Sequence, residues 1–301
     1  MDGVFNIYKE KGFTSHDVVA VVRKTINQKK VGHTGTLDPD AEGVLPVCVG
    51  KATKLADYIM ADTKTYRATV KLGIITDTYD TTGEIIEEKE VTASKDDIAL
   101  VVKSFIGKQE QLPPMYSAIK INGQKLYDLA RKGIEVERKP RSIEIYDISL
   151  DEFISDIEFA ITVSCSKGTY IRTLCFDIGE KLGCGAAMSS LIRLRSGAFE
   201  SKDAITLGRL KELSEAGLAE EYLMDVSFVL RDYKKVRATE KADKLLKNGC
   251  KIYSYYWDKQ SDKVIEGDVV LGCDYKNEPV GIYKICKEEN KVCIKPVKML
   301  L

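Results

Sequence analysis

The segment VGHTGTLDPDAEGVLP, residues 31–46, tells most about the fold and function of this chain. Glycine, threonine and proline are too frequent here for a continuous helix, and apolar residues alternate too little for an ordinary strand. Holding an irregular loop in one conformation costs conformational entropy, so such a loop is typical of a functional segment. His33 and Asp38 lie within it, five residues apart. We interpret the segment as a rigid loop that presents the Asp38 carboxylate to a substrate.

Length and composition favour a globular protein with two domains. The chain has 301 residues, of which 44% are hydrophobic, and this is enough for a sizeable core. The formal net charge is zero, with 46 basic and 46 acidic residues, so bulk charge does not favour nucleic-acid binding. A local basic stripe would still be sufficient for it. No apolar run is long enough for a membrane span, and we expect a soluble, cytoplasmic protein.

The cysteines and histidines predict neither disulfides nor a metal site. There are eight cysteines, and no two are separated by only two residues. We therefore expect free thiols in a reducing compartment. The two histidines, His16 and His33, have no companions at the spacing of metal ligands.

Hydrophobic periodicity predicts an α/β body followed by a small β-rich tail. Strands are expected at 4–8, 65–73, near 85–86, 116–121, 142–149, 156–165 and near 190–199. Helices are expected to start at Thr14 or Ser15, Thr53, Ser94 and Leu126, the last after an Asn122–Gly123 turn, and at 170–182 and 206–217. After about residue 232 we expect one helix at 239–248 and short strands near 251–256, 267–272, 279–286 and 291–296. From residue 236 onward, 13 basic and 10 acidic residues make the tail mildly basic.

Asp38 is the first candidate for chemistry, and Arg172 is its candidate partner. An aspartate before proline often caps its own turn, and this structural alternative stays open for Asp38. The functional alternative is a carboxylate that a cation keeps ionised as a nucleophile or base. Arg172 lies where a helix begins, and the helix dipole there favours anions over cations. Its position indicates a specific anion nearby, although a surface arginine is the plain alternative.

Tyr66, His33, Lys167 and Gly168 are candidates for substrate binding. Tyr66 lies on the apolar face of its strand, either as a core aromatic or as a ring that stacks on a nucleobase. His33 is either a core or turn histidine or a ring that stacks on, or replaces, a displaced base. Lys167 and Gly168 could approach a phosphate through charge and a backbone N–H. Most of a further group of cations are expected to be solvated: Lys9, Lys11, Lys29, Lys30, Lys120, Lys125, Arg131 and Arg141.

Five blocks of sequence together resemble the TruB family of tRNA pseudouridine synthases. They are GHTGTLDP at 32–39 with GVLPVCVGKATKL at 43–55, KTYRATVKLG at 64–73, PPMYSAIKINGQKLYDLARKGIEV at 113–136, CSKGTYIRTL at 165–174 and KLGCGAAMSSLIRLRSG at 181–197. The likeness runs in order, with family spacing, from about residue 3 to 230. One departure is visible, because the family often has Asp-Lys-Pro where this chain has Tyr8-Lys9-Glu10.

The resemblance implies a fold and a division into domains. Residues 1–232 are expected to form an α/β (α+β) pseudouridine synthase domain, with a central mixed, largely antiparallel sheet flanked by helices. Residues 233–301 resemble, more loosely, a small β-rich PUA-like domain that binds RNA.

The resemblance also implies roles for single residues. Asp38 falls on the catalytic aspartate, Arg172 on the arginine that pairs with it, and Tyr66 on the tyrosine that stacks on the target base and is proposed to take part in proton transfer. Tyr170 falls on a residue that lines the pocket, and His33 on the histidine that occupies the space left by the flipped nucleotide. The expected substrate-binding set is completed by Lys9, Lys167 and Gly168.

The implied reaction breaks the N1–C1′ bond of a uridine, turns the uracil over and rejoins it through C5. No cofactor and no metal are needed for this isomerisation. The aspartate could begin by attacking the sugar, by attacking the base or by removing a sugar proton. The implied substrate is uridine 55 in the T-loop of tRNA, with the acceptor arm contacted by the C-terminal domain. We expect a monomer that needs no protein partner and no membrane.

Two rival interpretations stay open from the residues alone. A non-catalytic RNA-binding or RNA-folding protein would share a basic cleft and the tail, but it would not need a positioned carboxylate facing polyanionic RNA. A hydrolase would use Asp38 to activate water on a nucleotide. It would need a metal or a second acid, for which the sequence offers no convincing pair.

Overall fold

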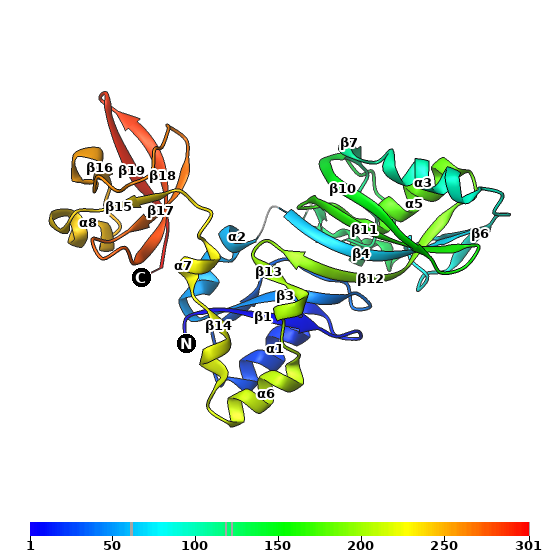
Figure 1. Cartoon of the computed structure of the whole chain (residues 1–301), viewed down its shortest axis with the longest axis horizontal. Helices are drawn as coiled ribbons and strands as arrows, with labels where there is room; N and C mark the ends of the chain where they lie inside the picture. Colours follow the sequence, from blue (N-terminus) through cyan, green and yellow to red (C-terminus); the bar gives the residue numbers. More distant parts are fainter. Residues whose placement is uncertain (61–62, 118, 122, 301) are drawn as a thin grey trace. The chain divides into compact units, whose positions relative to one another are not determined.

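The computed structural model describes residues 1–60, 63–117, 119–121 and 123–300, and its chain forms two compact units (Figure 1). Unit 1 comprises Met1–Pro39, Leu45–Met60 and Lys202–Leu301, and unit 2 comprises Asp40–Val44 and Ala61–Ser201. The chain thus passes from one unit to the other four times. Each unit is described in turn.

The first part of unit 1 joins both ends of the sequence in one core. Its strands are β1 (Gly3–Lys9), β2 (Val31–His33), β3 (Glu42–Val49, which begins in unit 2) and β14 (Leu223–Met224), and its helical segments are α1 (Ser15–Thr25), η1 (Gly50–Leu55), α2 (Ala56–Ile59), α6 (Leu207–Glu215), η3 (Ala219–Tyr222) and α7 (Val226–Val229). β1 pairs antiparallel with β14, and β2 with β3. Helices α1 and α6 pack on one another (Figure 1).

Helix α1 starts where the sequence predicts it. The Thr14 hydroxyl accepts from the Asp17 N–H, and the Asp17 carboxylate accepts from the Thr14 N–H, which makes a capping box. The apolar stripe of the helix, including Val18 and Val22, is buried against Leu45. Local capping and the burial of one face therefore fix this helix at the same residues.

The second part of unit 1 is a β-rich module with its own core. The strand order is β15 (Lys235–Arg237), β17 (Val269–Cys273), β18 (Pro279–Glu288), β19 (Lys291–Met299) and β16 (Ile252–Tyr253). It also contains η4 (Glu240–Ala242), α8 (Asp243–Lys247) and η5 (Ser254–Tyr256). The strands predicted near 267–272, 279–286 and 291–296 are confirmed. The strand predicted near 251–256 is limited to β16, because η5 follows it, and the helix predicted at 239–248 is divided into η4 and α8. β15 was not predicted, because three residues are too few to show a period.

Unit 2 is built on an antiparallel sheet in the order β12 (Ala186–Ser196), β4 (Thr63–Leu72), β11 (Glu158–Ser166), β10 (Arg141–Phe153) and β7 (Gly107–Gln111). On the other side of β12, Glu42 and Gly43 of β3 pair parallel with it. Helix α5 (Ile171–Leu182) packs on β12 and β4, and α3 (Lys95–Lys103) packs on α5 and β10 (Figure 1). The predicted α/β class with a mixed, largely antiparallel sheet flanked by helices is confirmed.

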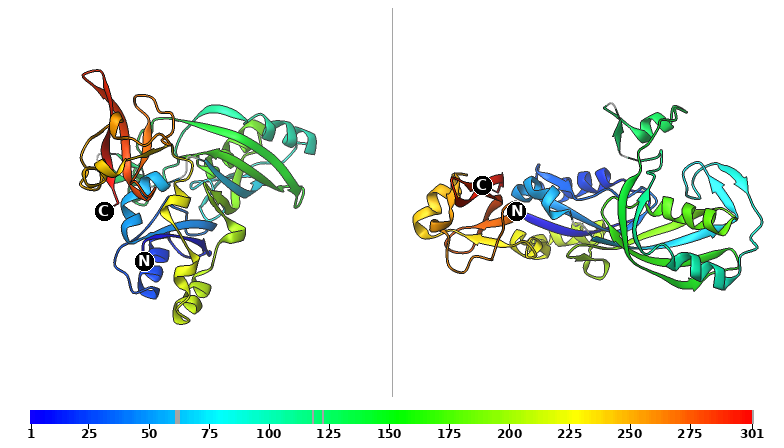
Figure 2. Two further views of the ribbon diagram at one scale, coloured as in Figure 1. Left: turned by 60° about the vertical axis from the view of Figure 1, so that its left-hand side comes forward. Right: turned by 90° about the horizontal axis from the view of Figure 1, so that it is seen from above.

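Unit 2 also carries short hairpins. β5 (Ile74–Thr76) pairs with β6 (Ile85–Glu88), β8 (Lys120–Ile121) with β9 (Gln124–Lys125), and β13 (Phe199–Glu200) with the end of β12. η2 (Ser201–Asp203) follows β13. In the right-hand view of Figure 2, the segment with β8, β9 and α4 (Leu126–Ala130) extends away from the sheet.

Three further predictions about local structure, all outside the β-rich module, were wrong in part. The 31–46 segment is irregular only at 34–41, because β3 is buried on both faces and therefore shows no alternation. Thr53 caps no helix, since its hydroxyl donates to the Gly50 carbonyl inside η1. The strand expected at 116–121 is limited to β8, because its partner β9 ends where α4 begins. Asn122, in the predicted turn, lies outside the described residues.

All eight cysteines are free thiols, as predicted. Burial raises the pKa of the Cys48 thiol to about 12 and that of Cys165 to about 11, which keeps both protonated. None of the helices in the described ranges is long and apolar enough to cross a membrane.

A substitution at Gly43 measures how much the close approach of β3 to β12 contributes to stability. Its φ is +101°, and a Cβ atom there would lie 2.3 Å from the Arg193 carbonyl oxygen. We expect Gly43→Ala to destabilise the protein by about 2–4 kcal/mol, because backbone strain and a clash with β12 add up. Gly107, with φ +115° and no atom within 4 Å of a Cβ, is the matched control. Gly107→Ala should cost only the strain, and equal losses of Tm for the two variants would contradict this account.

Candidate active site

The candidate residues are divided between the units. Unit 1 contains Lys9, His33 and Asp38, and unit 2 contains Tyr66, Lys167, Gly168, Tyr170 and Arg172. Within unit 1 the structure brings the Lys9 side chain to the loop of Asp38. Within unit 2 it gathers Lys167, Gly168, Tyr170 and Arg172 at the turn from β11 into α5.

The loop that carries Asp38 is anchored on both sides of that residue. Before it, the buried Ser15 hydroxyl accepts from the Leu37 N–H at 2.9 Å and is within 3.1 Å of the Leu37 carbonyl, to which it donates. After it, the Pro39 carbonyl accepts from the Gly12 N–H at 3.0 Å and from Lys9 Nζ at 2.9 Å. The irregular segment is therefore held by hydrogen bonds from other elements, namely the start of α1 and the end of β1.

Lys9 corrects one prediction. The pattern placed it among the exposed cations, but its side chain is fully buried at the end of β1, a strand that is covered on both faces. A buried ammonium group must be solvated by the protein. Lys9 Nζ donates to the carbonyls of Glu10 and Pro39, so its charge links the end of β1 to the loop of Asp38. Its expected contact with substrate stays a prediction.

His33 ends β2 and is half-buried. Its ring meets the ring of His16 edge to face, with centroids 5.4 Å apart. His16 is exposed on the first turn of α1. The packing of the two rings orients the His33 side chain at the start of the anchored loop.

Tyr66 is buried near the centre of the unit 2 sheet. Its neighbours across the ladders are Val163 of β11 and Arg193 of β12. The Arg193 side chain is itself fully buried, and its Nε donates to the Val44 carbonyl at 2.7 Å. Strand periodicity predicts the buried face of Tyr66 correctly, and its stacking on a base stays a prediction.

At Tyr170, the N-cap residue of α5, both main-chain groups are hydrogen-bonded to the side chain of Gln111. Gln111 Oε1 accepts from the Tyr170 N–H at 2.8 Å, and Gln111 Nε2 donates to the Tyr170 carbonyl at 3.0 Å. Gln111 is buried at the end of β7. No sequence pattern predicts this role for Gln111, because a lone glutamine at the end of a weakly patterned strand is typical of a surface residue.

Arg172 lies in the first turn of α5 and is only 6% exposed. Its guanidinium donates to the carbonyls of Thr78, at 3.2 Å, and Tyr116, at 2.8 Å. It also forms an ion pair with the Asp80 carboxylate at 3.5 Å. The anion that the helix position of Arg172 indicates is therefore present within unit 2. Asp80 was not predicted for this place, and the pairing of Arg172 with Asp38 stays a prediction.

The Asp80 carboxylate is fixed by its own loop between β5 and β6. The hydroxyls of Thr78 and Thr82 donate to Asp80 Oδ1, as does the Thr82 N–H, which leaves Oδ2 toward Arg172. Next to it, Tyr116 donates its hydroxyl to Asp77 at 3.2 Å. Burial and the negative charge of Asp77 raise the pKa of Tyr116, so this hydroxyl stays protonated at neutral pH. Repeated Thr and Asp in TDTYDTT was the only sequence signal for this cluster.

Lys167 and Gly168 are both exposed at the turn after β11. Gly168 has φ +84°, and the Thr169 hydroxyl donates to the Ser166 carbonyl, which closes the turn. An exposed lysine beside a turn with accessible backbone can meet an anion. The phosphate contact expected for this pair stays a prediction.

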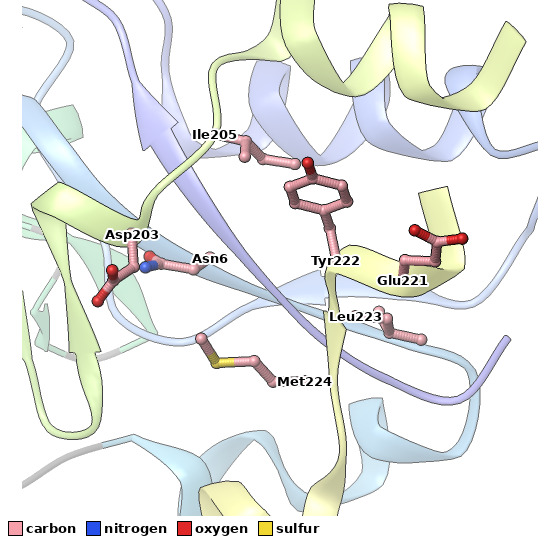
Figure 3. Close-up of a pocket in the computed structure, with 7 residues that line it drawn as sticks. All are labelled: Asn6, Asp203, Ile205, Glu221, Tyr222, Leu223 and Met224. Atoms are coloured by element: carbon pink, nitrogen blue, oxygen red, sulfur yellow. The ribbon is translucent and has the colours of Figure 1, made fainter. Parts of the chain in front are cut away.

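No group of three or more potential metal ligands occurs in the part of the chain that the structure describes. A cavity of about 230 Å³ lies in unit 1 and is shown in Figure 3. It is lined by Asn6, Asp203, Ile205, Glu221, Tyr222, Leu223 and Met224. None of the candidate residues is among them, so we do not connect this cavity with the candidate site.

Comparisons with known proteins identify the class of protein. Residues 23–171 match the N-terminal domain of TruB family pseudouridylate synthases, and residues 172–228 match the C-terminal domain of tRNA pseudouridylate synthase B. The chain therefore belongs to the TruB family of pseudouridine synthases, which are isomerases.

Among curated relatives, tRNA pseudouridine synthase B of Alkaliphilus oremlandii is 47% identical over 300 residues, which cover 100% of this chain and 99% of the relative. The protein of the same name from Clostridium perfringens is 51% identical over 254 residues, or 84% of this chain and 85% of the relative.

Solved structures agree with the family. A chain in the crystal structure of a Cbf5–Nop10–Gar1 complex aligns with a TM-score of 0.79 and 30% identity, over 99% of this chain and 85% of that one. A chain of an H/ACA RNP bound to a substrate RNA containing 2′-deoxyuridine gives a TM-score of 0.77 with 28% identity, over 99% of this chain and 85% of that one. The predicted pseudouridine synthase fold is confirmed.

The ion pair of Arg172 yields a stability test. Asp80→Asn keeps an oxygen that accepts from Thr78 and Thr82 but removes the negative charge beside a buried guanidinium. We expect a loss of about 1–3 kcal/mol in the free energy of unfolding. Arg138 and Glu135 are also 3.5 Å apart, but Glu135 is 80% exposed, so Glu135→Gln should cost less than about 0.5 kcal/mol. Denaturant unfolding of both variants measures the difference, and an equally small loss in each would refute it.

Proposed function

We propose that this protein converts uridine 55 in the T-loop of tRNA to pseudouridine. The family supplies the reaction type, and the names of the curated relatives point to tRNA as the substrate. The observation that carries the proposal is the anchored loop, in which Asp38 stands between two residues whose backbone is held by hydrogen bonds. Such preorganisation is what a catalytic carboxylate needs.

We assign the chemistry to Asp38, Tyr66 and Arg172. In this proposal Asp38 begins the reaction, and Arg172 is assigned as the partner of its carboxylate. Tyr66 stacks on the extruded uracil and offsets part of the unstacking free energy, which amounts to a few kcal/mol. Asp80 keeps the Arg172 guanidinium in place, and Tyr170 and His33 are assigned to substrate binding.

The proposal requires surfaces that attract RNA although the net charge is zero. A hollow of about 510 Å³ on the segment that extends from unit 2 is lined by Gly123, Gln124, Lys125, Asp128, Arg131 and Lys132. Three of these residues are cationic and one is acidic. We propose that this hollow and the exposed Lys167–Gly168 turn contact RNA phosphates.

We further propose that residues 233–301 form a separate RNA-binding domain, of PUA-like type, for the acceptor arm. On the outer face of its sheet, Lys284 and Lys295 lie directly opposite one another and are both exposed. Lys295 is also ion-paired with the Glu288 carboxylate, and we propose that RNA phosphates contact the exposed ammonium groups of both lysines. Tyr255 belongs to the same domain, is 65% exposed and stacks on Tyr253. We propose that its ring is available for stacking with an RNA base.

The eight free thiols and the tRNA substrate support a cytoplasmic location, and we propose that the enzyme acts there as a monomer. The decisive experiment uses the full chain and an unmodified tRNA transcript that carries tritium at C5 of uridine. Forming the C1′–C5 bond releases that hydrogen to water, so one equivalent of tritium per tRNA is expected. Protein that binds the transcript without releasing tritium would be the non-catalytic RNA-binding protein instead.

Asp38→Asn gives the sharpest test of the catalytic assignment. The amide keeps the size of the side chain and removes its negative charge. We expect tRNA binding within about threefold of wild type and no tritium release above background. A variant with robust turnover would show that another group carries the reaction.

The proposed RNA face of the C-terminal domain makes a separate prediction. Replacing both Lys284 and Lys295 by alanine should raise KM several-fold and lower the salt slope of binding by about one unit per lysine, while kcat at saturating tRNA changes little. Lys211→Ala, which removes an exposed lysine paired with Glu215 on α6, is the control and should alter KM less than twofold. Equal effects of the two changes would speak against this face.

A further inference from the structure

We propose that Ser15 is a positioning residue for catalysis, acting on Asp38 through the backbone of Leu37. This inference rests on the proposed function, since it gives Asp38 the catalytic role. It adds a residue that does not touch the substrate and that the sequence suggests only as a helix cap.

The Ser15 hydroxyl satisfies both main-chain groups of one residue. It accepts from the Leu37 N–H and donates to the Leu37 carbonyl, at 2.9 and 3.1 Å. Ser15 is 1% exposed and Leu37 is 4% exposed, so water cannot replace these bonds without opening the structure. A hydroxyl is the smallest side-chain group that combines a donor and an acceptor, and this explains why serine suits the position.

The hydroxyl is supplied by a rigid element. Ser15 is the first residue of α1. The same helix is buried in the core through Val18 and Val22. Leu37 is thus tied to α1, which has no freedom to follow a displaced loop.

The residue after Asp38 is fixed independently. Pro39 is anchored by Gly12 and Lys9, and a proline also restricts the residue before it to extended backbone conformations. With Leu37 and Pro39 both held, the carboxylate position depends mainly on the side-chain torsions of Asp38. Removing the Ser15 hydroxyl releases one of the two anchors and leaves the other intact.

The test compares Ser15→Ala with Thr14→Ala in the full chain on unmodified tRNA. Thr14 precedes Ser15, caps the same helix and makes its capping bonds on the surface with Asp17 alone. Both variants should lower Tm. We expect Ser15→Ala to lower kcat by about 10- to 100-fold with KM within twofold, because a small displacement of a catalytic group is costly. Thr14→Ala should keep kcat within twofold of wild type.

Ser15→Thr keeps the hydroxyl, and Ser15→Cys replaces it by a weaker donor and acceptor. We expect kcat to fall in the order serine, threonine, cysteine, which gives a test even if Ser15→Ala does not fold. Amide exchange at Leu37 should accelerate in Ser15→Cys more than exchange across the rest of α1.

The proposal is overturned by wild-type kcat in Ser15→Ala, by an equal loss in Thr14→Ala, or by equal kcat in the threonine and cysteine variants. Failure of the proposed function looks different, because wild-type protein would then release no tritium or Asp38→Asn would remain active.

Discussion

The candidate chemistry of this protein depends on reciprocal hydrogen bonds from one buried polar side chain to both main-chain groups of one residue. Ser15 binds Leu37 in this way beside Asp38, and Gln111 binds Tyr170 in this way two residues before Arg172. In each case a side chain from a regular element holds the main chain of a less regular segment.

Each unit also contains a buried cation that polar protein groups surround. Lys9 is buried among carbonyl groups, and Arg172 is buried with two carbonyls and the Asp80 carboxylate. Both cations are thus solvated by protein groups, which avoids most of the desolvation penalty of a buried charge. Asp80 is in turn fixed by threonine hydroxyls, so the position of Arg172 is set by a chain of polar contacts.

Much of the fold could be predicted from the sequence, because capping boxes and hydrophobic periods are local signals. The helix that starts after Thr14 and the strand of Tyr66 lie where those signals put them. The burial of Lys9 could not be predicted, since β1 is covered on both faces and a short buried strand shows no period. Asp80 lies 92 residues before its partner Arg172, and Gln111 lies 59 residues before its partner Tyr170. No local sequence pattern predicts contacts between residues so far apart. The contact of Asp38 with Arg172 belongs to the same long-range kind and stays a prediction.

The route of the chain restricts how this gene can be divided. Unit 2 is inserted into unit 1 in two pieces, and the first crossing, from Pro39 to Asp40, comes immediately after the anchored loop. No single cut separates the units, and a fragment that stops at Met60 would lack α6 and β14, which pack on its helix and strand. Recombination between relatives should therefore succeed by exchange of the internal stretch 61–201 as a cassette, with 40–44 changed alongside it, rather than by fusion of front and rear halves.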